Sequence, residues 1–110
     1  LIRADGKLAG FALVEERQII EPGAPRYTMA DFFVLKIYRR QGIGQQAAWD
    51  LFRRFTGSWL IQEHGANSVA QAFWRTAVGR YTRDTYEEKR YGIPERLFLV
   101  AQRFDSATGR

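Results

Sequence analysis

The sequence predicts a mixed α/β fold with the element order β-β-β-α-β-α-β-β. A strand, helix, strand pattern occupies residues 29–62 and favours two parallel strands joined by a crossover helix. A short hairpin precedes this unit, and a second helix and an apolar closing strand follow it. The chain has 110 residues, 45% of them hydrophobic and 26% charged. Such a chain can build its own core, so we expect residues 1–110 to form a single domain.

The first half of the chain contains the predicted β-strands that lead to the helix. Residues 1–4 and 7–14 read as two strands around a tight Asp5-Gly6 turn. Proline and glycine at positions 22–25 interrupt regular structure. The segment from Met29 to Tyr38 is β-rich and largely apolar, which predicts a central strand buried on both faces.

The second half alternates helices and strands. Residues 42–55 have the helical period, with one apolar face made by Ile43, Ala47, Ala48, Leu51, Phe52 and Phe55. Residues 58–62 form the second parallel strand, and Asn67 or Ser68 caps a helix that ends near Gly79. We expect a strand over 85–91, a turn over 92–94 and a closing strand over 97–101.

Composition excludes several kinds of site. The sequence has no cysteine, which rules out disulfides, a thiol nucleophile and thiolate zinc ligands, and its one histidine rules out a histidine-rich metal site. We therefore expect no metal. No uninterrupted apolar run approaches the roughly 18 residues of a membrane-spanning helix, and the start lacks the features of a signal peptide. These observations predict a cytoplasmic protein without a membrane partner.

The positive charge of the chain is concentrated in one segment. The formal net charge is +5, which suits nucleic acid, an anionic membrane or a phosphorylated ligand. Most of the excess lies between Lys36 and Arg54, where five basic residues accompany a single aspartate. The sequence lacks the alternation of aromatic and basic residues that binds single-stranded nucleic acid. A small phosphorylated ligand is therefore favoured over nucleic acid.

The turn Arg39-Arg40-Gln41-Gly42-Ile43-Gly44 joins the central strand to the helix and has the features of an anion site. Unpaired backbone N–H groups and the positive end of the helix dipole point at one place there. Gly42 and Gly44 let a phosphate approach without meeting a Cβ atom, and Arg39 and Arg40 add charge. An ordinary glycine turn before a helix is the alternative interpretation.

A dinucleotide-binding turn is a second alternative. Gly42, Gly44 and Ala47 match G-x-G-x-x-A, and Glu63 lies about 20 residues on, where a ribose-binding acid would stand. Against this, four residues separate the strand from the first glycine, and 110 residues are too few for two mononucleotide-binding halves. A P-loop is excluded because no Gly-Lys-Ser/Thr follows.

The sequence resembles the GNAT superfamily of acetyl-CoA-dependent N-acetyltransferases, whose motif is Arg/Gln-x-x-Gly-x-Gly/Ala after the central strand. Further matches follow in order along nearly the whole chain: Gly10-Phe11, Phe33-Val34-Leu35, Ala47, and Asn67-x-x-Ala70-x-x-Phe73-Trp74. The resemblance implies an acyltransferase that moves acetyl directly from acetyl-CoA to a primary amine, without a covalent enzyme intermediate or a metal.

The resemblance also implies a set of cofactor-binding residues. Backbone N–H groups from Arg40 through Gln45 would hold the pyrophosphate, and the backbone of Phe32 and Val34 would meet the acetyl carbonyl and the pantetheine arm. Asn67 would lie near the thiol end, although a simple helix cap explains it equally well. The full set is Phe32, Val34, Arg39, Arg40, Gln41, Gly42, Ile43, Gly44, Gln45 and Asn67.

The catalytic groups depart from the family pattern. Trp74 stands where many members have a tyrosine that protonates the leaving thiolate, and an indole is not a useful acid. Tyr81, two helical turns further on the same face, is the candidate replacement. Glu63 and His64, at the end of the second parallel strand, are candidates to deprotonate an incoming amine.

The front of the chain departs from the pattern as well. Complete members begin with a strand and one or two helices that form much of the acceptor pocket, and nothing before Leu1 supplies them. We expect that this part lies outside the sequence, that a partner chain replaces it, or that the chain binds CoA without transferring acetyl groups. Exposed strand edges or apolar patches would then favour a homodimer. A noncatalytic CoA-binding or assembly module is therefore the alternative function.

Overall fold

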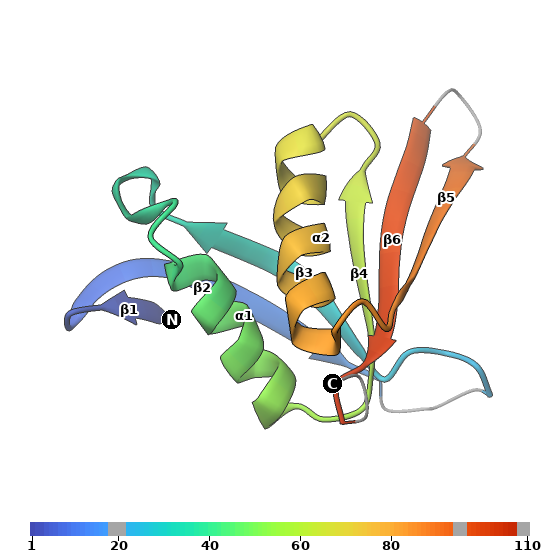
Figure 1. Cartoon of the computed structure of the whole chain (residues 1–110), viewed down its shortest axis with the longest axis horizontal. Coiled ribbons are helices and arrows are strands. Elements are labelled where there is room, and N and C mark those ends of the chain that lie inside the picture. Colours follow the sequence, from blue (N-terminus) through green and yellow to red (C-terminus); the bar gives the residue numbers. More distant parts are fainter. Residues whose placement is uncertain (18–21, 94–96, 108–110) are drawn as a thin grey trace.

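A computed structural model of the chain describes residues 1–17, 22–93 and 97–107 (Figure 1). The elements are β1 (Ile2–Ala4), β2 (Lys7–Glu16), β3 (Tyr27–Val34), the 3-10 helix η1 (Lys36–Tyr38), α1 (Ile43–Arg54), β4 (Ser58–His64), α2 (Ser68–Thr82), β5 (Glu87–Ile93) and β6 (Leu97–Asp105). The predicted mixed α/β order is confirmed. Several elements are longer than expected, and Pro94 of the predicted turn lies outside the described residues.

The six strands form one sheet in the order β1-β2-β3-β4-β6-β5. Asp5 and Gly6 both have positive φ angles, 51° and 77°, which is the backbone of a tight hairpin turn between β1 and β2. β3 and β4 run parallel, as predicted from the helix between them, and every other neighbouring pair is antiparallel. A single parallel pair does not make the sheet of a dinucleotide-binding fold, so that alternative is wrong.

β3 and β4 pair only at their beginnings. Their register comprises Tyr27 opposite Trp59 and Thr28 opposite Leu60. Beyond these residues β3 stays with β2 as far as Val34, and β4 stays with β6 as far as His64. The two strands therefore diverge toward their carboxyl ends, where α1 and α2 begin (Figure 1).

A bulge in β3 lies at the start of this divergence. Met29 pairs with Val14 and Asp31 with Leu13, so Ala30 is an additional residue without a register partner on β2. An extra residue reverses the alternation of side chains along a strand. Phe32 consequently joins Met29 on the side of the sheet that the helices cover, and it packs against Phe73 and Trp74 of α2.

The prediction of a strand buried on both faces from Met29 to Tyr38 is wrong. The strand ends at Val34, and η1 follows it. On the face opposite the helices, Phe33 is 40% exposed and its ring packs against that of Phe11, which is 42% exposed. In the described chain, α1 and α2 both pack on one face of the sheet, so these helices do not cover the apolar side chains on the other face.

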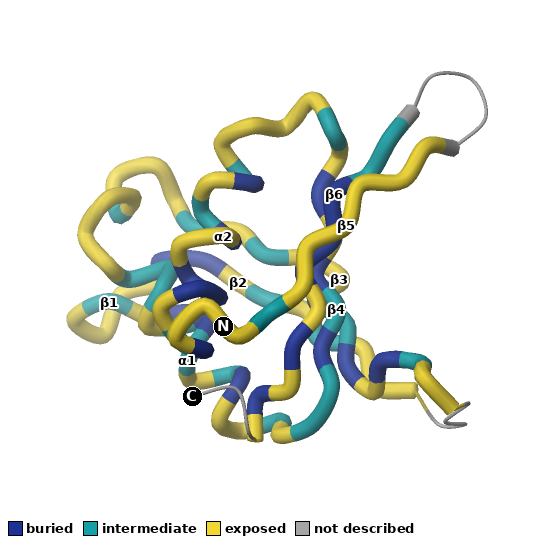
Figure 2. Tube along the Cα trace, turned by 45° about the vertical axis from the view of Figure 1, so that its right-hand side comes forward, coloured by how far each residue is buried: buried dark blue, intermediate teal, exposed yellow. Residues whose placement is uncertain are grey.

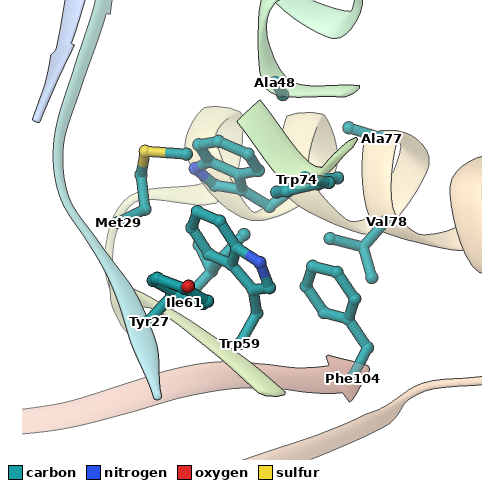
Figure 3. Packing of buried hydrophobic residues seen from close by; sticks show 10 residues of the cluster. Tyr27, Met29, Ala48, Trp59, Ile61, Trp74, Ala77, Val78 and Phe104 are labelled. Carbon is teal, nitrogen blue, oxygen red and sulfur yellow. The ribbon is translucent and has the colours of Figure 1, made fainter. Parts of the chain in front are cut away.

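The core lies between this helical layer and the sheet (Figure 3). Phe52 of α1 meets Trp59 of β4 and Phe104 of β6 with ring centroids 5.1 and 4.9 Å away. α2 adds Trp74, Ala77 and Val78 to the same cluster. Figure 2 shows that β6 is largely buried whereas β5, at the edge of the sheet, is largely exposed. The core thus fixes both helices over the point where β3 and β4 diverge.

Candidate functional site

The turn after β3 is held by its own side chains. Arg39 Nε donates a hydrogen bond to the carbonyl oxygen of Val34 at 2.9 Å, and Gln41 Nε2 donates to that of Ile37 at 2.9 Å. Arg40 and Gly42 both have a left-handed backbone, with φ angles of 64° and 78°. The side chains of Arg39 and Gln41 therefore stabilise the loop, which leaves its backbone N–H groups available.

These N–H groups form a row without acceptors. From Arg40 through Gln45, no backbone N–H donates to another part of the described chain, and no side chain caps α1. The next N–H, that of Gln46, donates to the carbonyl of Gly42 at 3.0 Å and starts the helical pattern. Unpaired N–H groups at the positive end of a helix favour an anion there. This is the segment in which the sequence predicts a pyrophosphate site.

Gly42 and Gly44 are required for different reasons. A Cβ on Gly42 would meet nothing within 4 Å, but its φ of +78° is a conformation that favours glycine. A Cβ on Gly44 would lie 3.1 Å from Phe73 Cε1 and 3.6 Å from Val34 Cγ2. The absent side chain of Gly44 thus makes room for Phe73 of α2. This close packing holds the beginnings of α1 and α2 together.

A hollow of about 250 Å³ lies where β3 and β4 separate. It is lined by Met29, Ala30, Asp31 and Phe32 of β3, by Ile61, Gln62, Glu63 and His64 of β4, and by Asn67, Ala70 and Trp74 at the beginning of α2. The predicted site residues Phe32 and Asn67 are thus brought together with both base candidates. Asn67 also caps α2, because its Oδ1 accepts a hydrogen bond from the N–H of Ala70 at 3.0 Å.

The backbone of β3 faces this gap at the predicted positions. The N–H of Leu35 donates to the carbonyl of Ala9 and therefore points toward β2. Backbone groups alternate in direction along a strand, so those of Phe32 and Val34 point toward the β4 side. β4 does not pair with β3 there, and the carbonyl of Val34 accepts from Arg39. The remaining groups of Phe32 and the N–H of Val34 border the gap.

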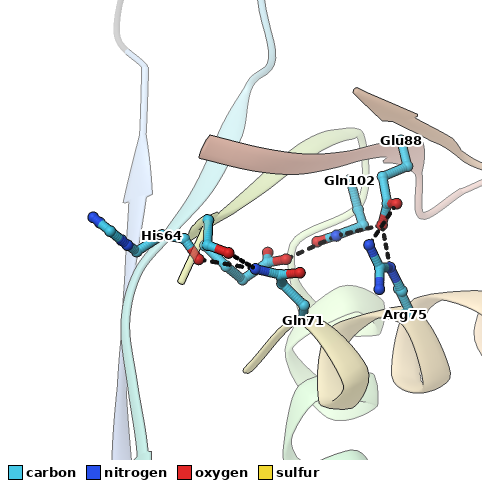
Figure 4. Close-up of polar contacts among 7 residues, drawn as sticks. His64, Gln71, Arg75, Glu88 and Gln102 are labelled. Carbon is cyan, nitrogen blue, oxygen red and sulfur yellow. Dashed lines mark hydrogen bonds and ion pairs between the residues drawn. The ribbon is translucent and has the colours of Figure 1, made fainter. Parts of the chain in front are cut away.

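Glu63 is the buried carboxylate of the hollow. Its residue is 5% exposed, and its Oε1 accepts a hydrogen bond from Gln102 Nε2 at 2.8 Å (Figure 4). Gln102 Nε2 also donates to Glu88 Oε1 at 2.9 Å, and Arg75 binds both oxygens of Glu88 at 2.8 and 3.0 Å. Burial raises the pKa of Glu63 to about 7, and the hydrogen bond from Gln102 opposes that rise.

This pKa predicts that Glu63 destabilises the fold above neutral pH. The pKa of Glu63 is higher in the folded chain than the value of 4.5 in the unfolded chain. The contribution of protonated Glu63 to the free energy of unfolding is therefore fully present below pH 4.5 and is lost as the pH rises toward 7. Glu63→Gln removes the ionisable group. Between pH 4.5 and pH 8 we expect the free energy of unfolding of the variant to rise by about 1 to 3 kcal/mol relative to that of the wild type. Urea unfolding of both proteins at both pH values measures this difference in free energy. A difference that is the same at pH 4.5 and pH 8 would contradict burial of an ionised Glu63.

His64, the second base candidate, also borders the hollow, but its side chain points to the side of β4 opposite that of Glu63. Its side chain is exposed, and its Nδ1 accepts a hydrogen bond from the N–H of Ala66 at 3.1 Å. Gln71 Nε2 holds the carbonyls of His64 and Gly65, both at 3.0 Å. Of the two candidates, Glu63 is therefore the one whose side chain is buried.

Tyr81 does not reach the hollow. Its hydroxyl donates a hydrogen bond to the carbonyl of Ser106 at 3.1 Å, and its ring packs on Phe52 with a centroid distance of 5.2 Å. Along α2 it lies about 20 Å from Asn67, given the rise of a helix. The helical period correctly placed Tyr81 on the inner side of α2, but that position is in the core and not at the reacting end. The structure thus corrects the expectation that Tyr81 is the acid.

Two residues of the hydrogen-bond network around Glu63 were not predicted from the sequence. Gln102 and Glu88 stand on β6 and β5, far along the chain from the glycine turn, and no local pattern connects them with Glu63. Once the strand order is known, the signal is the inward position of each residue on its strand. A buried polar residue such as Gln102 needs hydrogen-bond partners, so it would point to a network.

A second hollow, of about 420 Å³, lies between β1 and α1 and shares Gln41, Gly42 and Ile43 with the turn. Within residues 1–17, 22–93 and 97–107, no helix has the length and apolar character to cross a membrane. The same part of the chain contains no group of three or more metal-ligating residues.

The family model described as the acetyltransferase (GNAT) family matches residues 1–79. Among solved structures, the fold is similar to the crystal structure of the ribosomal-protein-S18-alanine N-acetyltransferase from Escherichia coli. The TM-score is 0.58 at 19% sequence identity, over 94% of this chain and 64% of that one. The chain thus spans less than two thirds of the length of that neighbour, and no curated protein matches it significantly. The family match, on a mixed sheet that opens beside a glycine turn, shows that the chain belongs to the GNAT family of acetyltransferases.

Proposed function

We propose that this chain binds acetyl-CoA and transfers the acetyl group directly to a primary amine. The observation that carries the proposal is the row of unpaired N–H groups from Arg40 through Gln45, which stands beside the opening between β3 and β4. An anion site next to a hollow suits a ligand with a phosphate at one end and a reactive group at the other.

The residues present fit such a ligand. The N–H groups from Arg40 to Gln45 would hold its pyrophosphate, with the exposed guanidinium of Arg40 adding positive charge. The backbone groups of Phe32 and the N–H of Val34 have no strand partner toward β4, so they are free to bond the amide groups of the pantetheine arm. Asn67 and Trp74 would flank the thiol end, because both line the hollow.

The chemistry expected in the hollow is attack of an amine on a thioester. A backbone N–H of β3 aimed at the thioester oxygen would stabilise the negative charge that develops during attack. The carboxylates of Asp31 and Glu63 line the hollow and favour a cationic amine as the acceptor. No metal and no covalent enzyme intermediate are needed, because a thiolate is already a fair leaving group.

A charge reversal in the turn tests the cofactor site. Arg40→Glu places a negative charge beside the row of N–H groups, and we expect it to weaken acetyl-CoA binding at least about tenfold. The matched control is Lys89→Glu on the exposed edge strand β5, which changes the net charge equally and should leave binding within about twofold. Isothermal titration calorimetry at fixed salt measures both. Absence of acetyl-CoA binding by the folded wild type would overturn the proposal.

Turnover separates an enzyme from a binding module. We expect release of free thiol from acetyl-CoA that depends on added amine, measured with a panel of a peptide N-terminus, a lysine side chain and a polyamine. The similar solved structure is named for acetylation of an alanine of ribosomal protein S18, so a peptide with N-terminal alanine belongs in the panel. A cytoplasmic location and a homodimer stay predictions, which fractionation and light scattering would test.

The second candidate function is a CoA-binding module without transferase activity. Trp74 favours it, because its indole lines the hollow and cannot protonate a leaving thiolate. This candidate predicts acetyl-CoA binding of normal strength with no amine-dependent thiol release.

A further inference from the structure

We propose that Arg80 of α2 recognises the 3′-phosphate on the ribose of acetyl-CoA, and that Gln45 is the positioning residue that directs its guanidinium group. The proposal rests on the cofactor binding proposed above and assigns a preference to the same site, for CoA thioesters over thioesters that lack this phosphate. It follows from a contact that joins the two helices beside the row of unpaired N–H groups.

Arg80 is directed at the beginning of α1. Its Nη1 donates a hydrogen bond to Gln45 Oε1 at 3.2 Å, although the two residues stand 35 positions apart in the chain. Gln45 lies in the first turn of α1 and contributes the last N–H of the row that starts at Arg40. The N–H of Gln45 therefore belongs to the anion site, and its side chain holds Arg80 next to that site.

The positive charge of Arg80 is available to a ligand. Within the described part of the chain its guanidinium makes no ion pair, whereas those of Arg26, Arg53 and Arg75 each bind a carboxylate. Arg80 is exposed, and the oxygen that it binds on Gln45 is uncharged. A guanidinium has five N–H donors, so those that remain can bind two oxygens of one phosphate at once.

The position of Arg80 decides which part of acetyl-CoA it can reach. Asn67 and Trp74 line the hollow expected for the thiol end. Along α2, Arg80 lies about 20 Å beyond Asn67, given the rise of a helix. It is thus placed for the opposite end of the ligand, the nucleotide. The phosphate on the ribose is a monoester with about two negative charges at neutral pH, and the row of N–H groups is already matched to the pyrophosphate.

The hollow between β1 and α1 is the competing place for this phosphate. It is lined by two arginines, Arg3 and Arg54, and borders the glycine turn. Asp50 lines it as well, and a carboxylate repels a phosphate. Arg54 is also the last residue of α1, where the helix dipole is negative. Both features favour the side of α1 that faces α2, where Arg80 lies.

Two ligands that differ only in the 3′-phosphate test this contact. Isothermal titration calorimetry at fixed salt compares acetyl-CoA with acetyl-3′-dephospho-CoA. We expect the wild type to bind acetyl-CoA at least about tenfold more tightly than the dephospho ligand. Arg80→Gln should weaken acetyl-CoA binding at least about tenfold and leave the affinity for the dephospho ligand within about twofold, so that the preference disappears.

Three further variants show the physical cause. Arg80→Lys keeps the charge without the planar pair of donors, and it should retain a preference of roughly threefold. Gln45→Met keeps the backbone N–H but removes the oxygen that holds Arg80, so it should reduce the preference without changing the affinity for the dephospho ligand. Arg54→Gln is the matched control, since it removes an equal charge at the other end of α1 and should leave both affinities within about twofold.

The outcomes separate this inference from the proposed function. If the folded wild type binds neither ligand, the proposed function fails. If the wild type binds both ligands equally, if Arg80→Gln weakens both equally, or if Arg54→Gln abolishes the preference instead, only recognition by Arg80 is overturned. An unchanged preference in Gln45→Met would remove its positioning role. Urea unfolding confirms that each variant folds before its affinities are compared.

Discussion

Replacing Gly10 by alanine is expected to cost about 3 kcal/mol or more of the free energy of unfolding. A Cβ at this position would lie 2.0 Å from the carbonyl oxygen of Phe33 and 2.9 Å from the Cα of Val34. These are backbone atoms of the neighbouring strand, so no side chain can move aside. β2 and β3 would have to separate where β3 presents Phe32 and Val34 to the gap, and acetyl-CoA affinity should fall together with stability.

Urea unfolding measures this effect, with Gly92→Ala as the matched control. Gly92 also lies in a strand, on β5, but a Cβ there would meet nothing within 4 Å. We expect the control to change stability by less than about 1 kcal/mol. Equal behaviour of the two alanine variants would show that the close contact between β2 and β3 does not exist in solution.

Phe52→Ala is expected to cost about 3 to 5 kcal/mol. Phe52 is fully buried and is the point at which α1 meets the sheet, since its ring contacts Trp59, Tyr81 and Phe104. Its removal leaves a cavity in the centre of the cluster and loosens the helix whose first turn carries the unpaired N–H groups. A variant that still folds should therefore bind acetyl-CoA more weakly.

Val69→Ala in α2 serves as the control for this substitution. Val69 is 79% exposed, so it should change the free energy of unfolding by no more than about 0.5 kcal/mol. Urea unfolding of both variants at the same pH gives the comparison. A loss below about 1 kcal/mol for Phe52→Ala would mean that α1 is not held by this core.

The anion site and the hollow occur together because of one feature of the sheet. Parallel strands place their carboxyl ends, and the beginnings of the helices that follow them, at the same edge. Gly44 then lets α1 and α2 approach each other at that edge, since Phe73 occupies the space of its missing side chain. The separation of β3 from β4 opens the sheet between the two helix beginnings.

Local patterns predicted the elements well. Asp5-Gly6 predicted the first hairpin, the apolar period of residues 42–55 predicted α1, and Asn67 predicted the cap of α2, all of which are confirmed. Each of these signals acts over a few residues of the chain, so the neighbouring sequence contains the physical cause. The glycine turn belongs to this group, because its left-handed backbone and its charges are local properties.

Long-range features were beyond such patterns. The bulge at Ala30 reverses which side chains of β3 face the helices. The apolar run that begins at Met29 contains no pattern that predicts this bulge. Tyr81 has the helical spacing of a site residue but lies at the core end of α2. Spacing along one element defines a face, and only the packing of other elements against it decides what that face meets.

The amino-acid sequence by itself determined the class of fold, the glycine turn and the family resemblance, because these depend on residues close together in the chain. The tertiary structure alone decided that Glu63 is buried against Gln102, that Gly44 makes room for Phe73, and that β3 and β4 part after Thr28. These facts depend on contacts between segments far apart in sequence. The proton affinity of Glu63 arises from such contacts, since burial and the neighbours on β5, β6 and α2 set it together.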